Sequence, residues 1–240
     1  EGKLKEVKLV IWTTTPWTIP ANEAISVNQE LDYVIAQGSD LSLIIIAKDL
    51  LGEVSENVGI NYEKIVFIKG SLLDGIVYEN PLFDKISPVV LGGDYITTDS
   101  GTGLVHTAPG HGVDDFITGK RYKLPISCPV DAKGFLTKEA GRFEGLNVLK
   151  DANNVIINDL KKSGSLLREV PYEHKYPYDW RTKKPTIFRA TEQWFASVEG
   201  FRDKALSAIK DVTWLPESGK NRIDSMVRER GDWCISRQRT

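Results

Sequence analysis

Two histidines and a pair of adjacent carboxylates lie within one short stretch of the sequence, residues 101–115. The histidines are His106 and His111, and the carboxylates are Asp114 and Asp115. An imidazole near a carboxylate can move a proton or bind a polar ligand, and the surrounding glycines let backbone amides approach that ligand. These residue types therefore predict a small active or binding site.

The same stretch has other interpretations. Asp114 and Asp115 could simply stabilise the start of a helix, with His106 as a hydrogen-bonded core residue, and the sequence leaves this alternative open. The histidines and aspartates could also bind a metal, but Pro109 interrupts the helical face that a paired-histidine site needs, so no metal is expected. A P-loop is excluded because no Gly-Lys-Ser/Thr sequence follows the glycines.

A second polar stretch, residues 13–18, follows an apolar segment. Prolines at positions 16 and 20 are expected to exclude both helix and strand, which leaves an ordered loop. Its hydroxyls could line a pocket, position a water or hold a ribose; alternatively, they could satisfy their own backbone in a turn. Trp17 is expected to be either a core plug or an apolar pocket wall.

The elements that must position these two stretches are mostly strands. Apolar alternation predicts strands over residues 7–12, 31–36, 42–47, 63–68, 87–91 and 104–107. Apolar stripes and end signals predict helices over residues 49–58, 115–122, 151–162, 200–210 and 217–230. The first half of the chain is therefore expected to be mainly β with peripheral helices, an α+β organisation.

Length and composition suggest one large domain with a smaller mixed lobe. The 240 residues become richer in aromatic and basic side chains from Ser165, which predicts domains over residues 1–164 and 165–240. The aromatic and basic run could stack on RNA, or it could be half-buried packing with extended cations. With 31 Lys and Arg against 33 Asp and Glu, a strongly basic nucleic-acid binder is not expected.

Neither membrane insertion nor secretion is indicated. The longest apolar run, residues 41–47, is too short to span a bilayer, and no signal-peptide core is present. Cys128 and Cys234 lack disulfide-framework spacing, which indicates a reducing compartment. Both ends of the sequence resemble interior cuts, so we expect a piece of a larger protein.

Four stretches, taken in order, resemble isoleucyl-tRNA synthetases of class I. They are Trp-Thr-Thr-Thr-Pro-Trp-Thr-Ile-Pro-Ala-Asn at 12–22, the histidine and aspartate stretch at 101–115, Phe-Arg-Ala-Thr-Glu-Gln-Trp-Phe at 188–195, and Asp-Trp-Cys-Ile-Ser-Arg-Gln-Arg-Thr at 232–240. The resemblance covers the whole chain and implies the inserted editing domain called connective polypeptide 1, a β-barrel. Pro16 and His106 favour the isoleucyl branch over its valyl and leucyl relatives.

The resemblance implies a hydrolase that removes valine from Val-tRNA(Ile) or from valyl-adenylate and excludes isoleucine by size. Asp115 would hold the substrate's α-ammonium group, and His106 would form the excluding wall. The implied catalytic residues are Asp115, Thr13, Thr14 and Thr15, and the implied substrate-binding residues are His106, Trp17, Asn22 and Thr18. The threonines and Asn22 would position the hydrolytic water and the terminal adenosine.

The resemblance also bears on cofactors and partners. The HIGH and KMSKS signatures are missing, so ATP and Mg would belong to an absent catalytic core, and no cofactor is expected in this fragment. Many relatives carry a Cys-x-x-Cys knuckle where this chain reads Asp-Trp-Arg-Thr at 179–182, so no metal is expected there either.

The expected partners are the 3′ acceptor end of tRNA(Ile), the valine moiety of the substrate and the rest of the synthetase chain. The fragment is expected to be a monomer without membrane contact, in the cytoplasm or an organellar stroma or matrix. The alternative function is a module that positions the tRNA acceptor end without hydrolytic activity of its own. A metal-dependent hydrolase is a more distant third.

Overall fold

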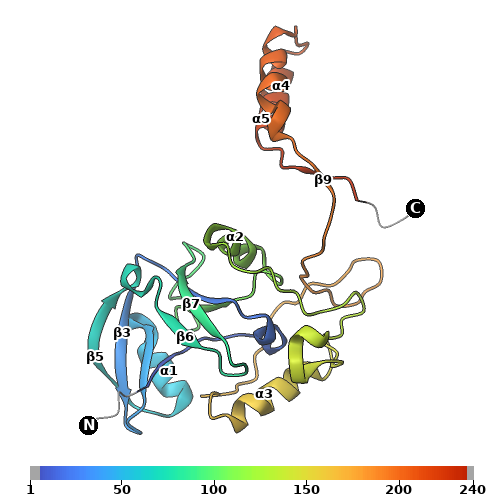
Figure 1. Ribbon diagram of the computed structural model, residues 1–240. Coiled ribbons are helices and arrows are strands. Elements are labelled where there is room, and N and C mark those ends of the chain that lie inside the picture. The colour runs from blue at the N-terminus through green and yellow to red at the C-terminus, as the bar shows by residue number, and fades with distance from the viewer. Residues whose placement is uncertain (1–5, 237–240) are drawn as a thin grey trace. The chain divides into compact units, whose positions relative to one another are not determined.

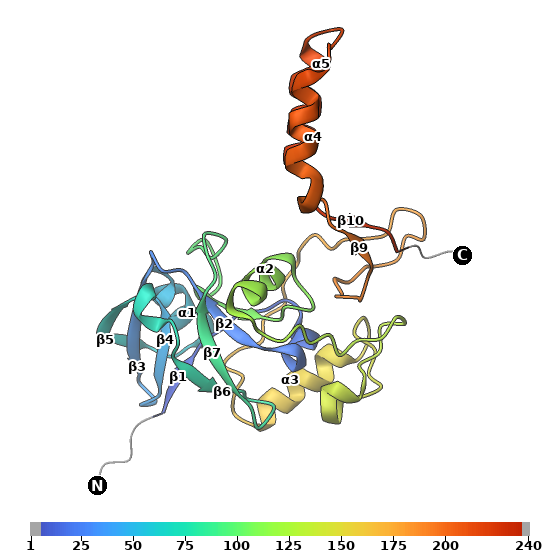
Figure 2. The same cartoon turned by 45° about the horizontal axis from the view of Figure 1, so that its top comes forward.

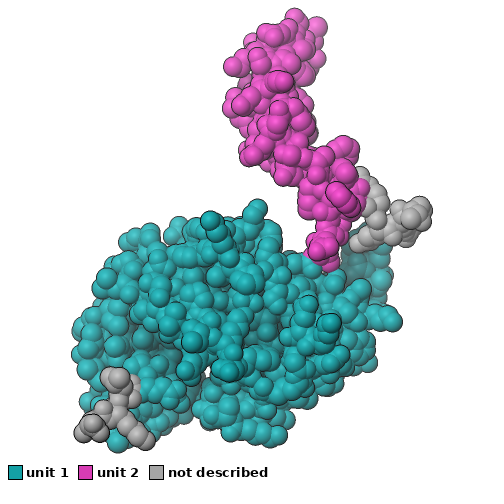
Figure 3. All heavy atoms as spheres, in the orientation of Figure 1, with its two compact units in different colours: residues 1–190 teal, residues 191–240 magenta. Residues whose placement is uncertain are grey.

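A computed structural model describes residues 6–236, and the chain divides into two compact units (Figure 3). The first unit is Glu1–Ala190 and the second is Thr191–Thr240. The change of composition at Ser165 therefore lies inside the first unit, because residues 165–190 cluster with the strands and helices that precede them.

The first unit contains two four-stranded sheets (Figures 1 and 2). One has the order β1-β4-β3-β5 and consists of β1 (Val7–Leu9), β4 (Leu43–Ala47), β3 (Asp32–Gly38) and β5 (Tyr62–Lys69). The β3–β4 and β3–β5 pairs are antiparallel, and β1 joins β4 in parallel. The predicted strands are confirmed here, with the first one shortened to three residues.

The second sheet supports the site. It has the order β6-β7-β2-β8 and consists of β6 (Val77–Glu79), β7 (Ile86–Leu91), β2 (Ala24–Val27) and β8 (Leu104–Thr107). Strand β2 pairs in parallel with β7 and antiparallel with β8, which places Ile25 opposite His106. The sequence did not predict β2, because all four of its residues are buried and it shows no alternation of polar and apolar residues.

The first half of the chain is mainly β with peripheral helices, as predicted, and the chain as a whole is a mixed α and β fold, but none of the sheets in the described residues is closed into a barrel. The sheets meet through isolated hydrogen bonds instead of a continuous ladder. For example, the Ala47 N–H at the end of β4 donates to the Thr102 carbonyl in the loop before β8, at 2.9 Å. A barrel would require these short contacts to extend along the strands.

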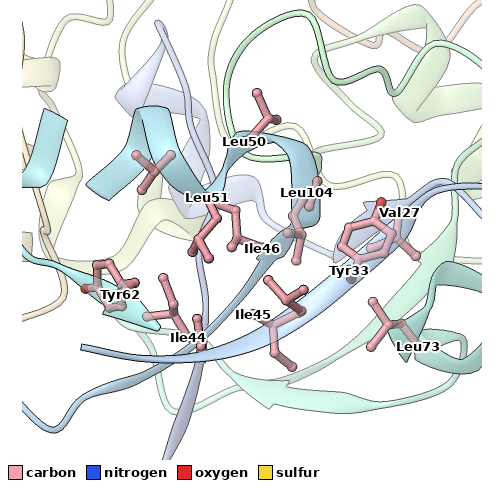
Figure 4. Packing of buried hydrophobic residues seen from close by; sticks show 14 of the residues in the cluster. Val27, Tyr33, Ile44, Ile45, Ile46, Leu50, Leu51, Tyr62, Leu73 and Leu104 are labelled. Atoms are coloured by element: carbon pink, nitrogen blue, oxygen red, sulfur yellow. The ribbon is translucent and has the colours of Figure 1, made fainter. Parts of the chain in front are cut away.

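The larger core lies against the first sheet and a helix that follows β4 (Figure 4). The chain leaves β4 through η2 (Lys48–Leu50) into α1 (Leu51–Val58), which ends at Gly59 in the left-handed conformation. Tyr33 is fully buried, and its hydroxyl donates to the Gly103 carbonyl at 2.7 Å. This bond ties β3 to the loop that precedes β8.

A second core supports the loop before β2. It packs α3 (Ala152–Lys162) and η4 (Lys138–Phe143) against η1 (Pro16–Ala21), with buried side chains that include Trp17, Phe143 and Ile156. Two further helices complete the first unit, η3 (Gly70–Leu73) and α2 (Val113–Tyr122). The helix predicted over 115–122 therefore starts two residues earlier, directly after Gly112.

The second unit is a helical hairpin with a short ribbon at its base. Helices α4 (Glu199–Asp211) and α5 (Ser218–Arg228) follow the predicted ranges, and β9 (Phe195–Ala196) pairs antiparallel with β10 (Trp233–Cys234). Leu206 and Ile209 are buried on α4, whereas α5 has no buried residue. Among the described residues, none of the helices combines the length and the apolar character that crossing a bilayer requires.

Candidate functional site

A cavity of about 300 Å³ lies where the threonine stretch, β8 and the first turn of α2 come together. Its lining residues are Trp12, Thr13, Thr14, Thr15, Thr18, Val105, His106, Ala108, His111 and Asp115. The structure therefore brings the two polar stretches predicted from the sequence into one site. Of the predicted site residues, only Trp17 and Asn22 are not part of the lining.

The segment that contains Trp17 and ends just before Asn22 is helical, which corrects the prediction of a loop. Residues Pro16–Ala21 form the 3₁₀ helix η1. Pro16 is compatible with this helix because it occupies the first turn, where an N–H has no partner within the helix. The next N–H, that of Trp17, donates to Asn153 Oδ1 on α3 at 2.9 Å. A side chain of α3 thus accepts a backbone N–H at the start of η1 that has no partner within that helix.

The threonines partly satisfy their own backbone, as a turn would. The Thr15 N–H donates to Thr13 Oγ1 at 3.0 Å, and the Thr18 hydroxyl donates to the Thr15 carbonyl at 2.9 Å. The same residues line the cavity, so the turn and the pocket are not exclusive alternatives. The turn fixes the threonine side chains at the edge of the cavity.

The ring of His106 is hydrogen-bonded through both nitrogens. Asn22 Nδ2 lies 2.8 Å from Nδ1, and Thr18 Oγ1 lies 3.1 Å from Nε2. The Thr18 hydroxyl already donates its proton to the Thr15 carbonyl, so it must accept from Nε2–H. The Asn22 amide then donates to Nδ1, and the ring is the neutral Nε2–H tautomer.

Burial lowers the pKa of His106 to about 4, with a smaller contribution from neighbouring His111. The Thr18 contact acts in the opposite direction and is outweighed. The ring is therefore uncharged at neutral pH. Its contribution to the cavity is a rigid, neutral wall with a fixed arrangement of hydrogens.

Asp115 lies in the first turn of α2, and its side chain is partly buried. Its Oδ2 accepts the Ala108 N–H at 3.2 Å. Burial raises the pKa of this carboxyl to about 6, and Asp114 adds to the increase, while the Ala108 hydrogen bond lowers it. Desolvation outweighs the helix terminus here, so the carboxylate is ionised at neutral pH but poorly solvated. A ligand cation would replace the lost solvation.

His111 also lines the cavity; the sequence placed it in the predicted active or binding stretch and named it as a possible metal ligand, without giving it a role in the implied site. Its Nδ1–H donates to the Phe188 carbonyl at 3.0 Å, and the Ala190 N–H donates to the Gly110 carbonyl at 2.7 Å. Residues 188–190 therefore hold the loop that carries His111. These contacts give the first three residues of the motif at 188–195 a structural role within the site.

The two predicted residues outside the lining support it from behind. Trp17 is buried in the second core, and its ring packs edge-to-face with that of His111, with 5.0 Å between the ring centroids. Trp17 thus has the place of the core plug, one of its two predicted alternatives. Asn22 is buried behind His106 and contacts the ring directly.

Trp12, Val105 and Ala108 are lining residues that the sequence did not single out. The only indication in the sequence was that each of them lies within two residues of a predicted site residue. Apolar residues that face a pocket have the same composition as residues that face a core. Only the folded structure shows that these three residues form part of the cavity wall.

In the described part of the chain, no three His, Cys, Asp or Glu side chains are grouped so that they could hold a metal ion. The segment at 179–182 is a turn held by hydrogen bonds. Asp179 Oδ2 accepts the Thr182 N–H at 2.6 Å, and Tyr178 pairs with Pro185 in an isolated bridge.

Comparison with known protein families finds one match that covers nearly the whole sequence. The model of the tRNA synthetases of class I (I, L, M and V) matches residues 2–240. The chain is 87% identical over 240 residues to an isoleucine–tRNA ligase of Prochlorococcus marinus (strain NATL1A), and 61% identical over 234 residues to that of Parasynechococcus marenigrum (strain WH8102). These alignments cover 100% and 98% of this chain, but 25% and 24% of the relatives.

Solved structures share the fold at low identity. The crystal structure of GlLeuRS-CP1 matches with a TM-score of 0.56 and 17% identity, over 70% of this chain and 86% of that chain. The editing domain of the P. knowlesi cytosolic leucyl-tRNA synthetase matches with a TM-score of 0.51 and 14% identity, over 66% and 82%. The fold is therefore that of CP1 and editing domains.

Proposed function

Because this chain belongs to the class I tRNA synthetases of the I, L, M and V group, we propose that it is the proofreading part of an isoleucine–tRNA ligase. The proposed reaction is hydrolysis of valine from Val-tRNA(Ile), and of valyl-adenylate. The high identity to isoleucine–tRNA ligases and the fold shared with leucyl editing domains support this assignment.

The need for such a reaction follows from the size of the two amino acids. Valine lacks one methylene of isoleucine, and a missing methylene changes binding by only about 1 to 3 kcal/mol; isoleucine against valine is the established example of this limit. A second site that is too small for isoleucine can remove the valine that was accepted in error. The proposed specificity is therefore exclusion by size.

One observation carries the proposal: the threonine stretch, His106 and Asp115 line a single cavity of about 300 Å³. Asp115 offers one poorly solvated negative charge to the α-ammonium group of an aminoacyl ester. The neutral ring of His106 is held on both nitrogens, so it is a wall that cannot easily move aside. Together they select a small side chain attached to a cationic amine.

The proposed chemistry is attack of a water on the ester carbonyl carbon. The bond from this carbon to the ribose oxygen breaks, and that oxygen leaves with a proton derived from the water; in valyl-adenylate the bond that breaks is the one to the phosphate oxygen. An activated ester requires orientation and support of the oxyanion more than a strong base. Thr13, Thr14 and Thr15 are the proposed groups that position the water and the terminal adenosine, and no covalent intermediate is proposed.

The proposed partners are the 3′ acceptor end of tRNA(Ile) and the rest of a synthetase chain. We propose that this step needs no ATP, Mg or other metal, and that the fragment acts as a monomer in the cytoplasm or an organellar matrix. The aminoacylation reaction itself would require the parts of the protein that lie outside this sequence.

The direct test is deacylation of Val-tRNA(Ile) by the 240-residue chain, with and without a metal chelator. Turnover above the spontaneous rate, unaffected by the chelator and lost in Asp115→Ala, would support the proposal. If the chain binds the tRNA but leaves the ester intact, it is a positioning module only. Sensitivity to the chelator would instead indicate a metal-dependent hydrolase.

A further inference from the structure

The side chain of Asn22 is enclosed by residues of the hairpin that β6, β7 and the turn between them form. Its Oδ1 accepts the Tyr78 hydroxyl proton at 2.5 Å and lies 3.5 Å from Asn80 Nδ2. The Asn22 backbone carbonyl accepts from Lys85 Nζ at 2.9 Å. The sequence singled out none of these three hairpin residues.

The direction of the Asn22 amide follows from its neighbours. Asn80 Oδ1 accepts the N–H groups of Leu82 and Phe83 at 2.9 and 3.3 Å, so the Asn80 NH₂ group must face Asn22. Asn22 therefore presents its oxygen to Asn80 and Tyr78. Its own NH₂ group faces the Ala24 carbonyl at 2.9 Å and His106 Nδ1 at 2.8 Å.

These contacts form a chain in which every hydrogen bond points the same way. Tyr78 donates to Asn22, Asn22 to His106, His106 to Thr18, and Thr18 to the Thr15 carbonyl. The chain begins on β6 and ends in the threonine stretch that lines the cavity. Since each group has one role, reversing any bond would leave a buried donor or acceptor unpaired.

We propose that Tyr78 is a positioning residue for His106: its hydroxyl, together with the Ala24 carbonyl, holds the Asn22 amide in one orientation and thereby keeps the cavity ring in a single tautomer and a single position. Tyr78 does not line the cavity, so it acts only through Asn22. The relevance of Tyr78 to catalysis rests on the proposed editing function, whereas its effect on the His106 ring does not depend on that function.

The test is ¹⁵N NMR of the histidine side chains in the 240-residue chain. In the wild type, His106 should show an unprotonated Nδ1 and a protonated Nε2. In Tyr78→Phe, Asn22 Oδ1 keeps only the 3.5 Å contact with Asn80, while the Ala24 carbonyl and Thr18 still favour the wild-type arrangement, so both nitrogen signals should shift measurably towards those of the second tautomer.

A matched control removes a tyrosine hydroxyl elsewhere. Tyr62 is buried on β5, and its hydroxyl has no hydrogen-bond partner among the described residues. Tyr62→Phe should therefore leave the His106 signals unchanged. Unchanged signals in Tyr78→Phe, or a wild-type ring protonated on Nδ1, would overturn the proposal; the second result requires no variant to fold.

Deacylation kinetics distinguish a failure of this proposal from a failure of the proposed function. Tyr78→Phe should lower kcat/KM for Val-tRNA(Ile) deacylation by about tenfold, which corresponds to one buried hydrogen bond left unmade. Tyr62→Phe should keep the wild-type value. If the wild type shows no deacylation, the proposed function fails, while the NMR result still decides whether Tyr78 positions the ring. A shifted tautomer with unchanged kcat/KM would refute the catalytic relevance alone.

Discussion

At the scale of single residues, the proposed site contains the neutral imidazole of His106 and the carboxylate of Asp115, whose charged form is destabilised by burial. Burial has opposite effects on the two groups, because it lowers the pKa of His106 to about 4 and raises that of Asp115 to about 6. At neutral pH the cavity therefore holds one negative charge and an uncharged wall. A cationic amine would meet an attractive group without competition from a protonated ring.

The pKa of Asp115 predicts the acid limb of the pH profile. Protonation of this carboxyl removes the anchor for the α-ammonium group, so kcat/KM for Val-tRNA(Ile) deacylation should fall as the pH drops through about 6. His106 stays neutral across that limb and should not contribute to it. Initial rates at low substrate concentration, measured across the limb, would check this; a flat profile would argue against Asp115 as the anchor.

Asp115 should also reduce the stability of the fold at neutral pH. Its folded pKa of about 6 lies above the ordinary aspartate pKa of 3.8, so between these two pH values the folded state binds more protons than the unfolded state, and stability falls as the pH rises through this window. Asp115→Asn keeps an acceptor for the Ala108 N–H without the charge. We expect the variant to gain about 1 to 2 kcal/mol at neutral pH, with little gain near pH 4.

Chemical denaturation of the two proteins at both pH values would measure this difference. The same variant should lose Val-tRNA(Ile) deacylation, since an amide cannot balance an ammonium charge. A variant that is less stable than the wild type at neutral pH would show that burial does not dominate the environment of Asp115.

At the scale of elements, the loop between β8 and α2 sets the position of Asp115. A Cβ on Gly112 would lie 2.7 Å from Asp115 Oδ2, whereas a Cβ on Gly110 would lie 2.0 Å from the Ser127 carbonyl oxygen. The first neighbour is the end of a side chain and can move; the second is backbone and cannot. The two glycines should therefore respond differently to alanine.

Gly112→Ala should fold and should lower deacylation by about tenfold to hundredfold, because the carboxylate is displaced from its working position. Gly110→Ala should instead lose about 1 to 3 kcal/mol of stability. Gly52→Ala in α1 is the control, since nothing lies within 4 Å of its added Cβ, and it should be neutral or slightly stabilising. Melting temperatures and deacylation rates of the three variants give the comparison, and full activity in a folded Gly112→Ala would contradict it.

Several elements were predictable because their residues alternate or carry clear end signals. This holds for β3, β4 and β5 and for the five α-helices of the described residues, whose observed bounds lie close to the predicted ones. Strands β2 and β6 were missed. The first is buried on both faces, and the second has only three residues, so neither shows a period that a pattern could detect.

The site was predictable in its residue types but not in its assembly. The threonine stretch meets His106 because β2 follows η1 directly and pairs with β8, a contact between segments about eighty residues apart that no local pattern encodes. Tyr78 and Asn80 carry no motif at all. Their role follows only from which way the Asn22 amide faces.

At the scale of the whole molecule, all residues that line the cavity belong to the first compact unit. The chain 1–190 should therefore retain Val-tRNA(Ile) deacylation within a few-fold of the 240-residue chain. A chain that ends at residue 164 should lose it. The shorter chain lacks the Phe188 carbonyl that holds His111, and the Ala190 N–H that holds Gly110.

Deacylation rates and circular dichroism of both truncated chains would separate loss of activity from loss of folding. Equal activity in 1–164 and 1–190 would place the functional boundary at the change of composition near Ser165. It would also mean that residues 188–190 do not support the cavity.

The central claim, a cavity that selects the smaller ester by size, is tested most directly by the ratio of kcat/KM for Val-tRNA(Ile) and Ile-tRNA(Ile). The wild-type chain should prefer the valyl ester by at least about tenfold. His106→Ala, which removes the neutral wall, should narrow the ratio by accelerating hydrolysis of the isoleucyl ester. Equal rates for both esters in the wild type, or an unchanged ratio in a folded His106→Ala variant, would contradict the claim.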